Sequence, residues 1–170
     1  SIEQISVTAA DNRPVIFTEQ DGVLSIDPSQ FNNLPEKAEL QLTINYQVSD
    51  QQDSTLNTAT VIITGTNDAP TIAPINHPDV NEDDALFTIN LLQGADDAEG
   101  EPLTVDNIQV TADDGRTVIY SVNNGIVSID PDQFNDLLPN AELQLTINYD
   151  LNDPYTSIAN TASVTIIGSN

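Results

Sequence analysis

Acidic side chains gather in a few short stretches around the middle of the chain. These stretches are Asn67-Asp68, Glu82-Asp83-Asp84 and residues 96–101 (DDAEGE), and Asp153 follows a long β-like segment. Carboxylates packed this closely repel one another unless a cation lies between them. Calcium suits such a group, because it takes about 6–8 oxygen ligands from carboxylates, amides, backbone carbonyls and water. The clustering therefore predicts calcium binding.

The overall charge limits the partners that the chain can have. Among 170 residues, 27 are acidic and 3 are basic, which gives a net charge of −24. Nucleic acids and anionic membranes both reward Lys and Arg, so neither is an expected partner. No apolar run reaches the about 18–20 residues of a membrane span, and no insertion of this segment is expected. Because cysteine is absent, disulfides, zinc–thiolate sites and thiol catalysis are excluded.

Adaptation to salty surroundings is an alternative explanation of the acidity. Excess carboxylates on every face keep a protein soluble at high salt. Such adaptation accounts for charge spread over the whole surface. It does not account for the gathering of carboxylates in a few stretches.

The sequence contains a long internal repeat. Ile5–Asn67 aligns without gaps on Ile108–Asn170 at an offset of 103, and 35 of the 63 aligned residues are identical. The densest block, AELQLTINY, occurs at Ala38–Tyr46 and again at Ala141–Tyr149. A period near 100 residues is the size of a whole domain rather than of a solenoid unit, so tandem domains are expected.

The repeat also sets the domain boundaries. The second copy has a leader, roughly residues 68–105, that has no counterpart in the first copy. We therefore predict an incomplete first repeat at 1–67, which lacks its opening strand, and a complete second repeat at 68–170. Residues 65–72 form the predicted linker between the two repeats.

The missing strand has consequences for the first repeat. An unpaired sheet edge is a liability, and the loss of a strand is expected to uncover Leu42 and Ile44. A strand donated by a neighbouring molecule would solve both problems. The sequence thus predicts self-association through the first repeat.

Alternating apolar and polar residues indicate strands throughout each repeat. In Glu142–Tyr149 every second residue is apolar, and Ala162, Val164 and Ile166 continue the pattern. Asn124-Gly125 is typical of a hairpin turn, and Asp130-Pro131 of a helix start. About seven short strands in about 100 residues predict an all-β fold of tandem antiparallel Greek-key β-sandwiches of the immunoglobulin type, with the first copy truncated.

Several segments resemble a known family. GTNDAPTI at Gly65–Ile72, VNEDD at Val80–Asp84, ADDAEGEPLTV at Ala95–Val105 and LND at Leu151–Asp153 resemble the cadherin-like repeats of large bacterial adhesins. These include the extender modules of repeats-in-toxin biofilm adhesins. The resemblance implies a calcium-stiffened spacer in a long adhesin, secreted to the bacterial cell surface, that supports cell adhesion and biofilm formation. The implied partners are neighbouring repeats of the same adhesin.

The resemblance also implies a set of calcium ligands, since cadherins bind calcium between consecutive domains. Glu99 stands where the family has Asp in a D-A-D segment, and Asp27 is followed by Pro-Ser instead of Arg-Glu. Asp27 has a helix N-cap as its alternative role, and the other acidic stretches an ordinary turn or hinge. The implied ligands are Asn67 and Asp68 of the linker, Asp97 and Glu99, Asp153, Asp27, and Glu82, which would serve the junction after the second repeat.

Two other classes of function compete with a spacer. A glycan- or protein-binding module would use exposed aromatic residues, and Tyr155 is the one candidate, since aromatic residues total 5%. An enzyme is not expected. The only histidine, His77, lies in a linker-like segment, and a glycosidase needs two carboxylates facing across a cleft.

Overall fold

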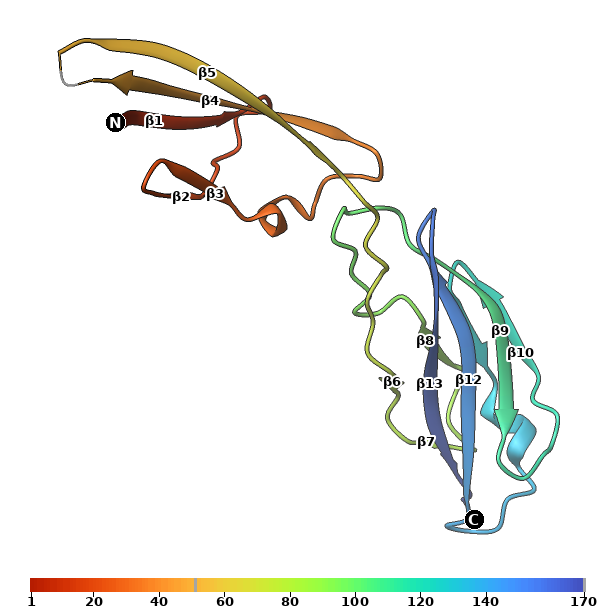
Figure 1. Ribbon diagram of the computed structural model, residues 1–170. Helices are drawn as coiled ribbons and strands as arrows, with labels where there is room; N and C mark the ends of the chain where they lie inside the picture. The colour runs from red at the N-terminus through yellow and green to blue at the C-terminus, as the bar shows by residue number, and fades with distance from the viewer. Residues whose placement is uncertain (51, 170) are drawn as a thin grey trace. The chain divides into compact units, whose positions relative to one another are not determined.

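The computed structural model describes residues 1–50 and 52–169, which form two compact units, Ser1–Asp68 and Ala69–Asn170 (Figure 1). Gln51 and Asn170, which belong to the predicted repeats, lie outside the described residues. Both units consist of strands joined by turns, with one short 3-10 helix in each. No helix in the described part of the chain is long and apolar enough to cross a membrane.

Unit 2 is a sandwich of two sheets. One sheet has the order β10-β11-β8, and the other has the order β6-β13-β12-β9 with β7 also paired to β13. Pairing is antiparallel except for β6 and β7, which run parallel to β13. The strands are β6 (Ile75–Asn76), β7 (Val80–Asn81), β8 (Phe87–Asn90), β9 (Thr104–Ala112), β10 (Tyr120–Asn123), β11 (Ile126–Ile129), β12 (Glu142–Asn152) and β13 (Ser157–Ile167).

The core of unit 2 lies between these sheets. Every second residue of β12, from Leu143 to Leu151, is at most 2% exposed. These side chains share one cluster with Ile89 of β8 and Val127 of β11 in the other sheet. One face of each sheet is therefore buried, which is what the alternating sequence encodes. The predicted all-β sandwich is confirmed.

Unit 1 repeats only part of this arrangement. Its strands form a sheet of order β1-β4-β5 and a separate β2-β3 hairpin. By the internal repeat these correspond to β9, β12, β13, β10 and β11, and the described residues of unit 1 contain no counterpart of β6, β7 or β8. The strands are β1 (Ile2–Ala9), β2 (Phe17–Gln20), β3 (Val23–Ile26), β4 (Glu39–Ser49) and β5 (Ser54–Thr64).

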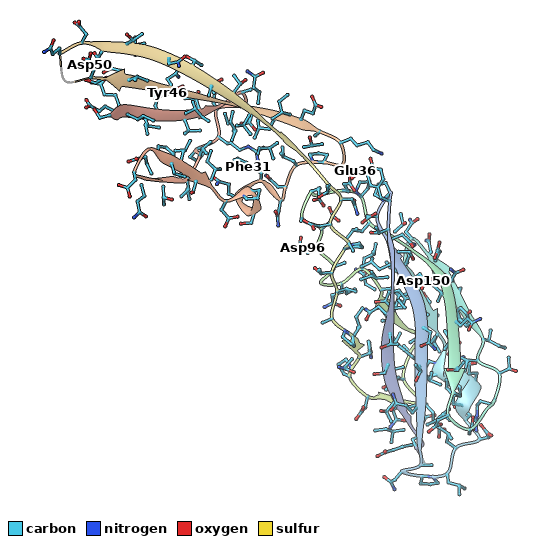
Figure 2. All side chains as sticks on the ribbon, in the orientation of Figure 1. Phe31, Glu36, Tyr46, Asp50, Asp96 and Asp150 are labelled. Carbon is cyan, nitrogen blue, oxygen red and sulfur yellow. The ribbon has the colours of Figure 1, made fainter. Side chains whose placement is uncertain are left out.

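The expectation that Leu42 would be uncovered is wrong. Leu42 is 0% exposed, because it packs in a small cluster with Phe31 and Leu34, and Ile44 is half-buried. Other apolar residues of the same sheet are exposed instead: Val48 is 47% exposed and Val61 is 42% exposed. Phe31, the last residue of the 3-10 helix Pro28–Phe31 that packs against Leu42, is labelled in Figure 2.

Local turn chemistry agrees with the sequence. Asn124 and Gly125 have φ values of 49° and 75°, as a tight hairpin turn requires. Asp130 caps the 3-10 helix Pro131–Phe134 and accepts a hydrogen bond from the Asp132 N–H at 3.2 Å. Phe134 of this helix is fully buried, so the cap fixes a core residue.

Arg116 closes a loop beside this helix. Its Nε donates to Asp114 and its guanidinium also donates to Asp136, both at 2.7 Å. The backbone N–H of Arg116, followed by its side chain, lowers the pKa of Asp114. The guanidinium lies 5.9 Å from the centre of the Phe134 ring, within cation–π distance.

Gly168 is expected to be irreplaceable. A Cβ there would overlap the Leu138 carbonyl oxygen, and the backbone of Gly168 hydrogen-bonds to Asn140 and Ala141. Gly168→Ala should lower the free energy of unfolding of unit 2 by about 3 kcal/mol in denaturant titrations. Gly115→Ala is the control, because its Cβ meets nothing and only its positive φ costs about 1 kcal/mol. Equal losses in the two variants would contradict the steric argument.

Candidate metal centre

Three carboxylates of unit 2 come together at one end of the sandwich. Asp97, Glu101 and Asp153 each offer an oxygen, and these oxygens all lie within 4.8 Å of one another. Asp97 and Glu101 belong to the loop between β8 and β9, and Asp153 follows β12. Figure 2 labels Asp96, the residue before Asp97, at this end of unit 2.

Asp97 is held in place by its own loop. Its Oδ1 accepts hydrogen bonds from the backbone N–H groups of Glu99 at 3.1 Å and Glu101 at 3.0 Å. Gly100 between them has a φ of 75°, which lets the chain turn back over the carboxylate. Asp97 Oδ2 is buried and has no hydrogen-bond partner among the described residues. A buried carboxylate oxygen of this kind is costly unless a cation neutralises it.

Asp153 is fixed by the turn between β12 and β13. Its Oδ1 accepts from the N–H groups of Tyr155 at 2.6 Å and Thr156 at 2.5 Å, and its Oδ2 accepts from the Thr156 hydroxyl at 2.6 Å. The side chain is buried, with the residue only 8% exposed. Tyr155 is 56% exposed beside it.

This donor set fits calcium. All donors are carboxylate oxygens, which suit hard cations, and two oxygens bound to one calcium at about 2.3–2.6 Å can lie up to about 5 Å apart. The 4.8 Å spread of the three carboxylates is within that limit. Coordination would also satisfy the buried Oδ2 of Asp97.

Glu101 is the member of this cluster that the sequence did not single out as a ligand. The resemblance implied Glu99, but the three-carboxylate group contains Glu101 and not Glu99. The backbone N–H groups of Glu99 and Glu101 donate to the same oxygen of Asp97, so the loop wraps tightly around that carboxylate. In the sequence, only the spacing of Glu101 four residues after Asp97 indicates that Glu101 could be a ligand.

Glu82 directly follows β7, which Figure 1 shows toward the C-terminal end of unit 2, and its backbone N–H donates to the Ile167 carbonyl at 3.0 Å. It is 4% exposed, and its Oε1 accepts from the Ser169 N–H at 2.9 Å. The Ser169 hydroxyl also donates to Asp83. Glu82 Oε2 is buried with no hydrogen-bond partner in the described part of the chain. Glu82 therefore does not join the Asp97 cluster, and its role at a following junction stays a prediction.

The remaining predicted ligands lie in unit 1. The Asn67 N–H donates to Glu36 at 2.9 Å and lowers the pKa of that carboxyl, while the Asn67 amide donates to the Asp68 carbonyl at 2.9 Å. Asp27 caps the helix Pro28–Phe31 by accepting from the Ser29 N–H at 2.9 Å, which lowers its pKa. Asp27 and Asp68 both line a pocket of about 330 Å³. Asp27 thus takes its alternative role as a helix cap, and the calcium roles of Asn67 and Asp68 stay predictions.

Comparison with known proteins gives a family and several similar structures. The cadherin-like domain family matches residues 66–167. No curated protein sequence matches the chain. Similar solved structures include an endo-fucoidan hydrolase of glycoside hydrolase family 107, with 19% identity and a TM-score of 0.42. The match covers 98% of this chain and 24% of that chain.

Cadherin structures are also similar. The EC1-4 segment of Drosophila N-cadherin has 16% identity and a TM-score of 0.43, with 99% of this chain and 41% of that chain covered. The EC1-2 segment of human protocadherin-24 has 15% identity and a TM-score of 0.42, with 98% and 82% covered. The chain thus spans less than half the length of the first two of these three structures. Because the family match extends over more than half of the 170 residues, the chain belongs to the cadherin-like domain family, a class of extracellular modules generally related to adhesion.

Proposed function

We propose that this chain is a calcium-stiffened spacer from a long secreted adhesin of the bacterial repeats-in-toxin type, where it supports cell adhesion and biofilm formation. The observation that carries the proposal is the group of Asp97, Glu101 and Asp153, in which a buried carboxylate oxygen of Asp97 has no hydrogen-bond partner among the described residues. The family membership and the tandem repeat support it.

Calcium would act on the ends of each repeat. Asp97, Glu101 and Asp153 would hold the ion, and it would neutralise their mutual repulsion. Asn67 and Asp68 directly precede unit 2 in the sequence, and we propose that their oxygens complete the coordination. An ion shared in this way would restrict the hinge between repeats.

The same chemistry explains where such a protein would become rigid. In a compartment with little calcium the clustered carboxylates repel one another, and the chain stays flexible. Outside the cell, at millimolar calcium, the sites would fill and the array of repeats would extend. A net charge of −24 keeps the chain soluble in either state.

Small-angle scattering of the full chain tests the proposed function. Calcium at 1–5 mM should narrow the distribution of end-to-end lengths. Asp68→Asn and Asp97→Asn should each keep it broader, because each removes the negative charge of a proposed ligand and so weakens calcium binding. Asp132→Asn is the matched control, since it removes one charge outside the acidic clusters. Equal distributions with and without calcium in the unchanged chain would overturn the spacer proposal.

A further inference from the structure

The first residues of unit 2 are hydrogen-bonded to the loop that carries the metal centre. In this entry segment, residues 70–73, the Thr71 N–H donates to the Asp96 carbonyl at 2.8 Å, and the Asp96 N–H donates to the Thr71 carbonyl at 2.9 Å. Pro70 is fully buried, and Ile72 packs against the core of unit 2. Because Asp96 directly precedes Asp97, the two bonds join the entry segment to the proposed metal loop.

Asn160 of β13 makes a second connection between the same two parts of unit 2. Its side-chain amide has two hydrogens, and it donates to the Ala73 carbonyl at 3.2 Å and to the Tyr149 hydroxyl at 2.7 Å. The Tyr149 hydroxyl in turn donates to the Leu91 carbonyl at 3.0 Å. Leu91 directly follows β8, where the metal loop begins. Asn160 therefore connects the entry segment to the first residue of that loop.

The part of the loop between β8 and Asp97 contains little slack. The Gln93 N–H donates to the Asn90 carbonyl at 3.1 Å, and the Ala95 N–H donates to the Leu92 carbonyl at 3.1 Å. These bonds form two overlapping turns immediately before Asp96. A displacement of Asp97 is therefore passed to its neighbours and is not absorbed by loose chain.

The bridge between Thr71 and Asp96 is also a weak point of unit 2. It is a single pair of residues outside the named strands, and both residues are exposed. Exposed backbone hydrogen bonds with few apolar contacts open at low free-energy cost. Without a cation, repulsion among Asp97, Glu101 and Asp153 acts on the residue next to this bridge. Opening of the loop and opening of the bridge are therefore expected to occur together.

We propose that the Thr71–Asp96 bridge and Asn160 form a latch through which calcium at the Asp97 centre holds the entry segment on unit 2. The inference rests on the proposed calcium site and adds the residues through which the ion acts on the segment after the linker. Asn160 is not a member of the carboxylate group, so it is a positioning residue and not a ligand. The coupling is reciprocal: the factor by which calcium favours the closed latch is the factor by which the closed latch raises calcium affinity.

Hydrogen exchange of the unchanged chain, followed by NMR, tests the first half of this coupling. Calcium should slow exchange of the Thr71 and Asp96 N–H groups at least about fivefold relative to chelator, the lower end of typical coupling between two sites. The Asn140 N–H, which donates to the Gly168 carbonyl in another loop of unit 2, is the control and should slow less. Equal slowing at all three N–H groups would indicate general stabilisation of unit 2 and would overturn the latch.

Calorimetric calcium titration of variants of the full chain tests the second half. Asn160→Ala should lower calcium affinity about fivefold with unchanged stoichiometry, because it removes one connection of the latch and no ligand. Asn57→Ala is the matched control, since the Asn57 amide donates to the Tyr46 hydroxyl of unit 1 at 2.9 Å, and it should leave the affinity unchanged. A merely structural role of Asn160 would lower stability in chelator without changing calcium affinity.

Thr71→Pro is the second variant, and it keeps the test decisive if Asn160→Ala does not fold. It removes the Thr71 N–H from the bridge at an exposed position and should also lower calcium affinity. Unchanged affinity in the folded variants would overturn the latch and leave the proposed calcium site standing. Absence of calcium binding to the unchanged chain would overturn both the latch and the proposed function.

Discussion

Millimolar calcium should raise the melting temperature of the unit 2 transition by about 10 °C or more relative to chelator. An ion that binds only the folded state at about 100 times its Kd stabilises that state by about 2.7 kcal/mol. For a domain of about 100 residues each kcal/mol corresponds to about 4 °C or more. Calorimetry of the full chain, with and without calcium, measures the effect.

Variants that replace one carboxylate by an uncharged amide test which residues bind the ion. Asp97→Asn and Glu101→Gln preserve side-chain volume, and each should remove most of the calcium-dependent rise. In chelator the same variants should be as stable as the unchanged chain or more stable, because they relieve repulsion among the three carboxylates. A merely structural role for either residue would instead lower stability in both conditions.

Two controls separate calcium binding from charge screening. Asp132→Asn removes a charge outside the clusters and should keep the full calcium response. Magnesium should protect poorly, because its small octahedral shell keeps several waters. Equal protection by magnesium, or equal unfolding curves in calcium and chelator, would contradict the metal centre.

Much of the fold could be predicted because its signals are local. The alternation in Glu142–Asn152 encodes one buried face, and its apolar positions are buried as expected. Asn124-Gly125 encodes a turn through positive φ, and Asp130-Pro131 encodes a capped helical start. Strands β6 and β7 carry no such signal, because two residues are too short for any alternation.

The candidate site was less predictable because loops form it. Asp97 and Asp153 lie 56 residues apart in sequence, and only the packing of two turns brings them together. Glu101 joins them because Gly100 reverses the chain, which a ligand pattern read along the sequence does not contain. Leu42 was misjudged for a related reason: the helical turn at Phe31 covers it, so burial there does not need the opening strand.

Ile147→Ala should lower the free energy of unfolding of unit 2 by about 2–5 kcal/mol, because it removes a fully buried side chain and leaves a cavity. That loss is a large part of the about 5–15 kcal/mol of a typical domain, and the melting temperature should fall by about 10 °C or more. Denaturant titration of the full chain, followed by circular dichroism, measures both quantities.

Ile44→Ala is the matched variant, because Ile44 occupies the same position of the repeat and pairs with Ala59 as Ile147 pairs with Ala162. Because Ile44 is only half-buried, Ile44→Ala should lower the free energy of unfolding of unit 1 by only about 1 kcal/mol. The difference between the two losses measures the cover that β8 provides in unit 2. Equal losses for the two variants would show that unit 1 buries this isoleucine as completely as unit 2.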